Sequence, residues 1–213
     1  MFELEHVQFV SVFSLIKFPP PERACKGGPH ASSKRTKNWP GYYAKTAMFS
    51  PFFKAWRRVL YMDSRVNVRL PLLGLFFSAI DSSKSVLSNP DSFPKMEWTL
   101  RSQFHSDCDP LLFNKLEQLV DLNTTDYFQS TVVLYDTDAL PGPSAYEELV
   151  GMYHTWGPIA DSDQSILSLY FAATKRLYRP FPYRIENGIL PYDFAERIPD
   201  GKYILTAWRT FLV

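Results

Sequence analysis

Acidic side chains at the ends of apolar runs are the residues of this sequence best suited to chemistry. Asp63, Asp91 and the pair Asp136 and Asp138 each follow a β-rich run. In α/β sheets, ligands bind at the carboxyl ends of the strands. A carboxylate there can hold a divalent cation, which neutralises a diphosphate during group transfer. Taken singly, each Asp is also typical of a turn or a helix cap. The order and spacing of these residues along the chain must therefore distinguish a ligand site from local structure.

Arg65 follows Asp63 in "YMDSRV", at the position where a second carboxylate would complete a metal site. A guanidinium there would repel a divalent cation. It would instead hold diphosphate oxygens through charge-assisted, bidentate hydrogen bonds. The pair therefore predicts either a phosphate site that needs no metal or a site that has lost its metal.

Hydrophobic periodicity predicts strands and helices in alternation along the chain. The predicted strands are residues 6–16, 59–62, 85–91, 131–137 and 202–208, and the predicted helices are 42–56, 109–120, 144–157 and 161–175. This alternation predicts an α/β sheet with helices on both faces. The basic, Pro- and Gly-rich residues 17–41 are expected to form a mobile loop, either solvated or acting as a flap over a phosphorylated ligand.

Capping residues mark several of the predicted helix ends. Ser50 is expected to cap a second short helix after an interruption in the first helical pattern. Asp109 is expected to cap the helix that follows it. Ser144 and Glu147 are spaced as a capping box, and Gly157 is placed to end that helix.

Composition limits the class of protein. The chain has 213 residues, of which 46% are hydrophobic, so a single globular domain is expected. Lys and Arg (23) nearly balance Asp and Glu (22), and no overall field selects nucleic acid or an anionic membrane as a default partner. Cys25 and Cys108 are too few and too far apart for a metal knuckle or a disulfide framework. The most apolar stretch, residues 70–80, is about half as long as a membrane-spanning helix, so the chain as given is expected to be soluble.

Four segments in order resemble glycogenin-like and galactinol-synthase-like glycosyltransferases. They are "YYAKTAMFSPFFKAWRRVLYMDSRVNV", "DYFQSTVVLYDT", "DSDQSILSLYF" and "RPFPYRIEN". In that family a lysine-bearing helix precedes a "φφYxDxDxφφ" strand, and "xYFNSGφφφφN", "xxDQxφLNxxF" and "xLPxxYN" segments follow. The resemblance spans residues 42–187 and rests on the order and spacing of the four segments together.

The resemblance implies a GT-A-like fold, with a mixed, mostly parallel sheet flanked by helices on both faces. It also implies an enzyme that moves a hexose from a nucleotide-diphospho-sugar, usually a UDP-sugar, to a hydroxyl acceptor with retention of configuration. Mn²⁺ or Mg²⁺ is the cofactor that the family pattern would bring. Neither nucleic acid nor a membrane segment is expected as part of this function.

The resemblance also implies roles for individual residues on the phosphate and sugar sides of the site. Lys45 would pair with donor phosphate or sugar hydroxyls, and Asp63 would touch the ribose or the metal. Gln129 and Ser130 occupy the Asn-Ser positions that contact the donor sugar. The family's following glycine is Thr131 here, which narrows the space at that point.

Asp163 and Gln164 match the Asp-Gln pair at the sugar-facing end of a helix. By the resemblance, Asp163 would bind donor sugar hydroxyls, and Gln164 would support the charge that develops as the glycosidic bond loosens. Independently of it, Asp163 is also a residue typical of the start of a helix.

Two parts of the family pattern have no counterpart. The late metal histidine is absent, and His105 and His154 are either ordinary polar residues or metal ligands. Before His6 the nucleotide-binding strand and helix are expected to be missing, about seventy residues by analogy with βα units. The chain is therefore expected to be one N-terminally truncated domain over residues 1–213. The compartment is not predicted, and both the cytoplasm and, if an N-terminal anchor is missing, the Golgi lumen stay open.

These departures leave a second hypothesis open, a catalytically inactive GT-A-like protein that binds carbohydrate or acts as a scaffold. A nucleotidyltransferase is a weaker third hypothesis, because no glycine-rich, lysine-bearing phosphate loop is found. The sugar, the acceptor and the oligomeric state are not predicted.

Overall fold

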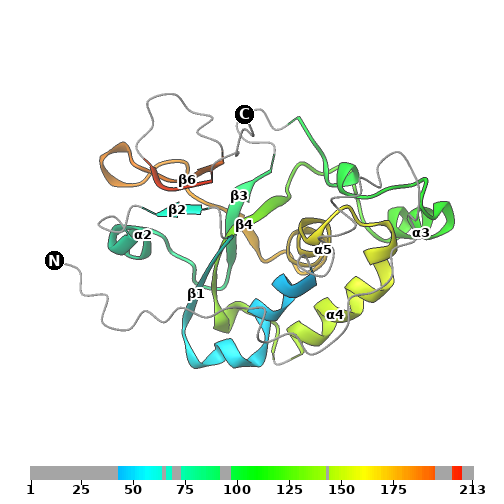
Figure 1. Cartoon of the computed structure of the whole chain (residues 1–213), viewed down its shortest axis with the longest axis horizontal. Coiled ribbons are helices and arrows are strands. Elements are labelled where there is room, and N and C mark those ends of the chain that lie inside the picture. The colour runs from blue at the N-terminus through cyan, green and yellow to red at the C-terminus, as the bar shows by residue number, and fades with distance from the viewer. Residues whose placement is uncertain are drawn as a thin grey trace.

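The computed structural model describes residues 43–63, 66–68, 73–91, 97–142, 144–194 and 203–207 (Figure 1). This part of the chain is a mixed α/β arrangement of two small mixed sheets and helices. The predicted strand 6–16, the predicted loop 17–41 and Arg65 lie outside the described residues.

The larger sheet has four strands in the order β1 (Arg58–Met62), β4 (Phe128–Asp136), β3 (Val86–Pro90) and β5 (Tyr178–Pro180). β4 pairs antiparallel with both β1 and β3, and β3 pairs parallel with β5. The sequence predicted the first three of these strands to within a few residues. The antiparallel pairing brings the start of β4 to the ends of β1 and β3.

The smaller sheet has three strands in the order β2 (Val66–Val68), β7 (Tyr203–Ala207) and β6 (Leu190–Phe194). β2 and β7 are antiparallel, and β6 and β7 are parallel. Three of the five described pairings are therefore antiparallel. The mixed sheet was predicted correctly, but the expectation of mostly parallel strands is wrong for the described residues, because an apolar run does not encode the direction of its partner.

β4 is the central strand, and its side chains alternate between two cores. Val133 and Tyr135 pack with residues of the helical layer, whereas Val132 and Leu134 pack with α2 (Leu73–Ala79) and the smaller sheet. Figure 1 shows the helices α4 and α5 on one side of the larger sheet and α2 with the smaller sheet on the other. A strand covered on both faces has no polar face, which explains the continuous apolar run in the sequence.

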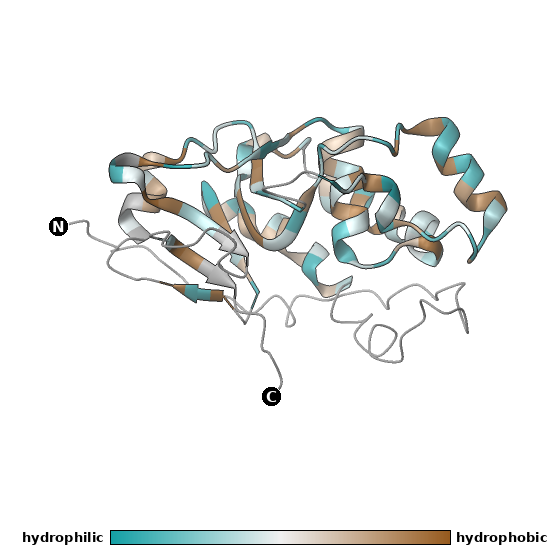
Figure 2. Cartoon of the chain, turned by 90° about the horizontal axis from the view of Figure 1, so that it is seen from above, coloured by the Kyte–Doolittle hydropathy of each residue, from teal (hydrophilic) through white to brown (hydrophobic). Residues whose placement is uncertain are grey.

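The helical layer contains α3 (Pro110–Leu119), α4 (Ala145–Trp156) and α5 (Asp163–Ser168), and α5 continues as the π-helix η8 (Leu169–Thr174). Short 3-10 helices lie at Leu100–Gln103 (η5), Thr137–Ala139 (η6), Gly157–Ile159 (η7) and Glu186–Gly188 (η9). Figure 2 shows polar and apolar residues alternating along α3, at the right-hand edge of the molecule. None of the described helices is long and apolar enough to cross a bilayer.

The predicted break in the first helical segment is confirmed. Two 3-10 helices, η2 (Lys45–Phe49) and η3 (Pro51–Ala55), are separated by Ser50, which is extended at φ −67° and ψ 158°. Proline begins the second helix, where its missing N–H costs no hydrogen bond. The Ser50 side chain makes no capping bond, so the expected cap is wrong although the break is right.

The two other predicted caps differ in outcome. Asp109 caps α3 as predicted, since its Oδ1 accepts the N–H of Leu112 at 2.9 Å. Cys108, the residue before it, is disulfide-bonded, a link that the sequence did not predict. Ser144 has helical dihedral angles and makes no capping bond, and its hydroxyl instead donates to Glu148 at 3.1 Å. The predicted capping box is therefore wrong.

Candidate functional site

A buried ion cluster at the ends of four elements is the candidate site. The Nζ atom of Lys45 lies 3.0 Å from Oδ2 of Asp163, 3.0 Å from Oδ1 of Asp63 and 3.2 Å from Oγ of Ser130. The Ser130 hydroxyl also donates to Asp163. Four residues that the sequence named as site candidates are thus joined in one hydrogen-bonded group, which we call the Lys45 cluster.

The antiparallel register of β1 and β4 positions two of these residues. Asp63 follows the last residue of β1, and its N–H donates to the carbonyl of Thr131 at 2.9 Å. Ser130, the third residue of β4, is therefore next to Asp63 across the ladder. The cluster depends on the strand direction that the sequence did not predict.

Asp163 is positioned by the turn before α5 and by the contact of α5 with β4. The Ser165 hydroxyl accepts the backbone N–H groups of Asp161 and Ser162, both at 3.1 Å. One turn further on, the Ser168 hydroxyl donates to the carbonyl of Phe128 at 3.2 Å. These bonds hold the first residue of α5 against the start of β4.

Tyr61 belongs to the cluster and was missed by sequence reasoning. Its hydroxyl donates to Oδ1 of Asp63 at 2.7 Å, and its ring centroid lies 5.6 Å from Nζ of Lys45. Residues two apart on a strand point to the same face. The tyrosine two residues before Asp63 was therefore visible in the sequence as a neighbour of that carboxylate.

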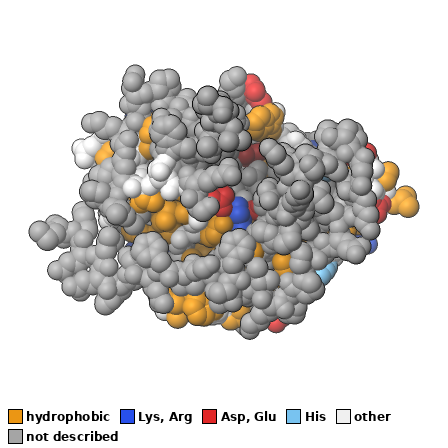
Figure 3. All heavy atoms as spheres, in the orientation of Figure 1, with side chains coloured by type: hydrophobic (Ala, Val, Ile, Leu, Met, Phe, Trp, Pro, Cys, Tyr) orange, Lys and Arg blue, Asp and Glu red, His pale blue; other side chains and the backbone are white. Residues whose placement is uncertain are grey.

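The cluster holds one ammonium and two carboxylates, largely away from water. Asp163 is 2% exposed and Lys45 is 9% exposed, whereas the side chain of Asp63 is 31% exposed. Asp63 is thus the solvent-facing member. In the space-filling view, acidic and basic side chains meet near the centre of the face that is shown (Figure 3).

Burial and charge shift the pKa values of the cluster in a consistent way. Burial alone would lower the pKa of Lys45, but the carboxylates of Asp163 and Asp63 outweigh it and raise that pKa. Burial raises the pKa of Asp163, against the opposing effects of Lys45 and Ser130. Burial, with the Asp63 carboxylate, also raises the pKa of Tyr61, which keeps its hydroxyl a donor. Lys45 therefore keeps its positive charge to a higher pH than a free lysine, whereas Asp163 gains a proton more readily than a free aspartate.

The described residues do not form a metal centre of the expected kind. Among them, no three His, Cys, Asp or Glu residues lie together as a ligand group. Asp63, the predicted metal ligand, bonds Lys45 and Tyr61. The Lys45 ammonium lies between the carboxylates of Asp63 and Asp163.

Gln129 lies next to Ser130 in β4 but belongs to a separate polar group. Its Nε2 atom lies 3.5 Å from the carbonyl oxygen of Asp91, and its Oε1 atom is buried without a hydrogen-bond partner. The Tyr127 hydroxyl donates to Oδ2 of Asp91 at 2.9 Å. Burial and the Asp91 carboxylate together raise the pKa of Tyr127. Asp91 therefore lies at the predicted strand end, where its carboxylate accepts a hydrogen bond from the Tyr127 hydroxyl.

Gln164 does not join Asp163 in the Lys45 cluster. Its Nε2 atom donates to Oε1 of Gln103 at 3.3 Å, on η5. Neighbouring helical residues point about 100° apart, so the Asp-Gln pair divides between two surroundings.

Asp136 and Asp138 lie at the opposite end of β4, so their predicted place in the site is wrong. Oδ2 of Asp136 is 3.6 Å from Nε of Arg57, and Oδ1 accepts the N–H of Asp138 at 3.0 Å. The physical reason is that β4 runs antiparallel to β1 and β3, so its carboxyl end points away from theirs.

The two histidines considered as metal ligands have ordinary surroundings. Nε2 of His105 lies 3.1 Å from Oδ1 of Asp161. His154 is exposed on α4, and its ring centroid is 6.5 Å from that of Tyr43.

Comparisons with known proteins give one distant likeness. The sequence matches no protein-family model and no curated protein. Among solved structures, mouse xyloside xylosyltransferase 1 in its apo form is similar with a TM-score of 0.39 and 12% sequence identity. The match covers 80% of this chain and 66% of that chain, so this chain spans just under two thirds of the length of that protein.

Proposed function

We propose that this chain is a GT-A-like glycosyltransferase domain that moves a hexose from a UDP-sugar to a hydroxyl acceptor with retention of configuration. One observation carries the proposal. Lys45 and Asp63, Ser130 and Asp163 come from three separate segments of the sequence resemblance, and they meet in one hydrogen-bonded cluster. A shared donor-binding site would require these segments to converge.

The phosphate side of the proposed site uses Lys45. Its ammonium has two carboxylate partners, and the Asp63 side chain is the more exposed of the two. A donor diphosphate would take part of the place of Asp63 and pair with the ammonium, as charge-assisted bonds favour. Because Asp163 stays buried behind Lys45, the ammonium keeps its orientation when the outer partner changes.

The sugar side uses Asp163, which would accept hydrogen bonds from donor sugar hydroxyls, as the sequence resemblance implies. In the transfer, the bond from C1 to the diphosphate breaks with its electron pair on the diphosphate. The acceptor oxygen bonds C1 on the same face, and its proton passes to the released diphosphate.

A catalytically inactive carbohydrate-binding protein is the second candidate. Two observations favour it: Gln164 is bonded to Gln103 rather than to the Lys45 cluster, and the described residues hold no group of three metal ligands. Such a protein would bind glycans through the same acceptors without turning over a donor.

Calorimetry and a donor-hydrolysis assay test the proposal. We expect heat on titration with UDP and UDP-sugars, with and without Mn²⁺, and hydrolysis of a UDP-sugar that Asp163→Asn abolishes. Asp138→Asn, an exposed change at the other end of β4, is the matched control and should keep the wild-type rate. Absence of heat with every nucleotide sugar would contradict the enzymatic proposal. Glycan binding without hydrolysis in any variant would favour the second candidate.

A further inference from the structure

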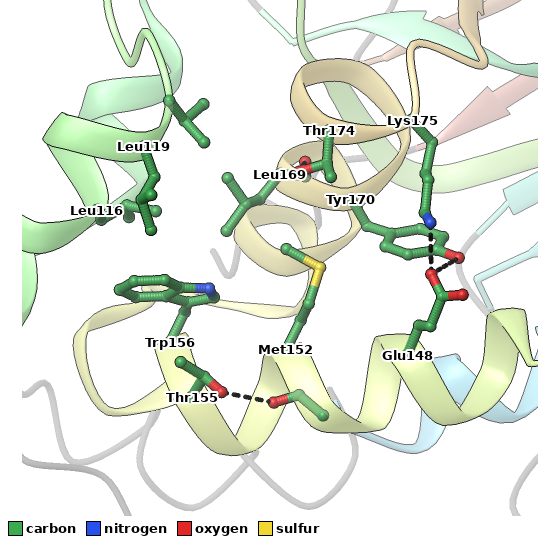
Figure 4. Close-up of a pocket in the computed structure, with 12 residues that line it drawn as sticks. Leu116, Leu119, Glu148, Met152, Thr155, Trp156, Leu169, Tyr170, Thr174 and Lys175 are labelled. Carbon is green, nitrogen blue, oxygen red and sulfur yellow. Dashed lines mark hydrogen bonds and ion pairs between the residues drawn. The ribbon is translucent and has the colours of Figure 1, made fainter.

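A cavity of about 470 Å³ lies between α3, α4 and η8. Figure 4 shows apolar side chains from these helices around it, with Glu148 and Lys175 together at one side. Its apolar lining comprises Leu116, Leu119, Val120, Met152, Trp156 and Leu169. Small-molecule sites are concave, mainly apolar and of about 300–1,000 Å³, and they occur between packed helices. The volume, the lining and the position of this cavity are those of such a site.

The two threonines of the lining already use their hydroxyl protons within the protein. The Thr155 hydroxyl donates to the carbonyl of Gly151 at 2.9 Å. The Thr174 hydroxyl donates to the carbonyl of Leu169 at 2.8 Å. Neither hydroxyl therefore has its proton left for a ligand.

The two charged groups of the lining cancel one another. Nζ of Lys175 lies 2.6 Å from Oε2 of Glu148, which also accepts the Tyr170 hydroxyl at 3.0 Å. The hydrogen bond from Lys175 lowers the pKa of Glu148, so the carboxylate is ionised at neutral pH and balances the ammonium. A charged ligand would lose hydration on entering and would meet no unbalanced charge in this lining. The lining therefore favours an uncharged, mainly apolar occupant.

The π-helix η8 forms a wall of the cavity that the core holds in place. Leu169 and Tyr170 are 0% and 1% exposed, and Thr174 completes the contribution of η8 to the lining. The N–H of Lys175 donates to the carbonyl of Tyr170 at 2.8 Å, a step of five residues that keeps the wide π turn. Turns of this kind are frequent at functional sites. Because the wall is already ordered, binding would carry a small entropic cost.

Gly151 is a residue of the lining that its neighbours in the fold do not require. It lies inside α4, where glycine destabilises a helix relative to alanine. A Cβ atom placed on it would meet no heavy atom within 4 Å, and its φ is not left-handed. A molecule in the cavity would account for the glycine, because a side chain at this position takes up part of the space.

Leu119 leaves apolar surface uncovered at the cavity. It is 65% exposed, whereas Leu116 on the same helix is 1% exposed. Removing apolar surface from water is the main favourable contribution to binding. An apolar ligand would therefore gain free energy by covering Leu119.

We propose that this cavity binds a small, uncharged and mainly apolar molecule. The volume has room for about fifteen non-hydrogen atoms, if each takes the roughly 30 Å³ of a liquid water molecule. That is the size of a medium-chain alcohol or a substituted aromatic ring. The inference is independent of the proposed transferase activity, because it uses none of the residues of the Lys45 cluster.

Methyl NMR of the whole chain, with methionine ¹³C-labelled at its methyl group, tests the inference. Met152 lines the cavity, and Met152→Leu identifies its signal. We expect 1-hexanol, 1-heptanol and 1-octanol to shift this signal until it saturates, with the Kd falling about fourfold for each added methylene. Octanoate and octylammonium should bind at least about tenfold more weakly than 1-octanol, because neither finds an unbalanced charge.

Filling the cavity from α4 tests whether it is the site. Gly151→Leu should raise the Kd for 1-octanol at least about tenfold, because the new side chain occupies the space. Thermal unfolding should show this variant to be no less stable than wild type, since leucine is a better helix former than glycine. Asn114→Leu places the same side chain at an exposed position of α3 outside the lining, and it should bind like wild type.

Two exposed leucines of α3 give a second matched pair. Leu119→Ser should raise the Kd about fivefold, whereas Leu111→Ser, at a position that is 82% exposed and outside the lining, should not change it. Absence of a saturable Met152 shift with 1-octanol would overturn the inference, as would a Kd that Gly151→Leu leaves unchanged. Equal losses in the two serine variants would mean adsorption to the general surface. Octanoate or octylammonium binding as tightly as 1-octanol would contradict an uncharged ligand.

Discussion

The Lys45 ammonium lies 3.0 Å from the Asp163 carboxylate, and both side chains are buried. Each charge makes the burial of the other tolerable. Removing one partner of a buried pair leaves an uncompensated charge, which costs far more than the pair itself contributes. Lys45 has this role toward two carboxylates at once, because Asp63 is its second partner.

Lys45→Met should therefore destabilise the fold by about 3–5 kcal/mol. Urea denaturation monitored by tryptophan fluorescence measures the change. The control is Arg101→Met, which breaks a half-exposed ion pair with Glu117 and should cost less than about 1 kcal/mol. Equal decreases in the free energy of unfolding for the two variants would show that the buried pair matters no more to stability than the half-exposed one.

Adding Asp163→Asn to Lys45→Met should recover part of this loss, because the buried charge is removed with its partner. The double variant should be more stable than Lys45→Met alone, and the two single costs should not add. The loss of stability in Lys45→Met should also be smaller at low pH, because protonation of Asp163 removes the uncompensated charge. Strict additivity of the single costs would contradict the direct coupling.

The alkaline limit of stability should depend on buried phenols, of which Tyr135 is the simplest case. Burial raises its pKa, and its hydroxyl donates to the carbonyl of Met48. An unfolded tyrosine ionises near pH 10, so above that pH the folded state binds more protons than the unfolded state. Stability then falls as pH rises, by about 1.4 kcal/mol per pH unit for each such phenol.

Tyr135→Phe should make that alkaline slope shallower by about 1.4 kcal/mol per pH unit. At neutral pH the variant should be about 1 kcal/mol less stable, because Met48 loses a donor. Urea denaturation at several pH values between 9 and 11 gives both quantities. A slope identical to wild type would mean that Tyr135 ionises equally in both states.

The caps of α3 and α4 should respond differently to the same kind of substitution. Asp109→Ala removes a capping bond to Leu112 and should cost about 1 kcal/mol. Ser144→Ala removes no capping bond and should cost clearly less. Thermal unfolding of the two variants side by side measures the difference, and a larger loss for Ser144→Ala would restore the predicted capping box.

Local features were the predictable part of the fold. The strand β1, the break at Ser50 and the Asp109 cap follow from apolar runs, proline and side-chain chemistry within a few residues. The direction of β4 and the conformation of Ser144 were not predictable in this way. Pairing direction depends on contacts far along the chain, and a cap depends on backbone angles that tertiary packing can override.

The site was predictable as a set of residues but not as a geometry. Lys45, Asp63, Ser130 and Asp163 were named from the resemblance and do meet. Gln129 was assigned to a donor-sugar contact and Gln164 to the charge that develops at the glycosidic bond, yet the structure bonds Gln129 to Asp91 and Gln164 to Gln103.

The reason is directional. Gln129 and Ser130 are neighbours on a strand and point to opposite faces, and Gln164 is rotated away from Asp163 on its helix. A sequence motif names positions along the chain, but the turn of the backbone between two adjacent positions decides which network each one enters.

Tyr61→Phe separates the positioning of Asp63 from the structure of the cluster. The substitution keeps the ring beside Lys45 and removes only the 2.7 Å hydrogen bond to Asp63. Lys45 would then be the remaining described partner of the Asp63 carboxylate, while Lys45 and Asp163 stay paired. If Asp63 touches the ribose of a donor, as the sequence resemblance implies, the Kd for UDP and the KM for the UDP-sugar should rise about fivefold to tenfold with kcat little changed.

Tyr183→Phe, on a half-exposed ring outside the cluster, is the matched control and should leave both constants at wild-type values. Calorimetry with UDP gives the Kd, and initial rates of donor hydrolysis give kcat and KM. A fall in kcat with an unchanged KM would place Tyr61 at the reacting atoms instead. Unchanged values of both would mean that Lys45 alone is sufficient to orient Asp63.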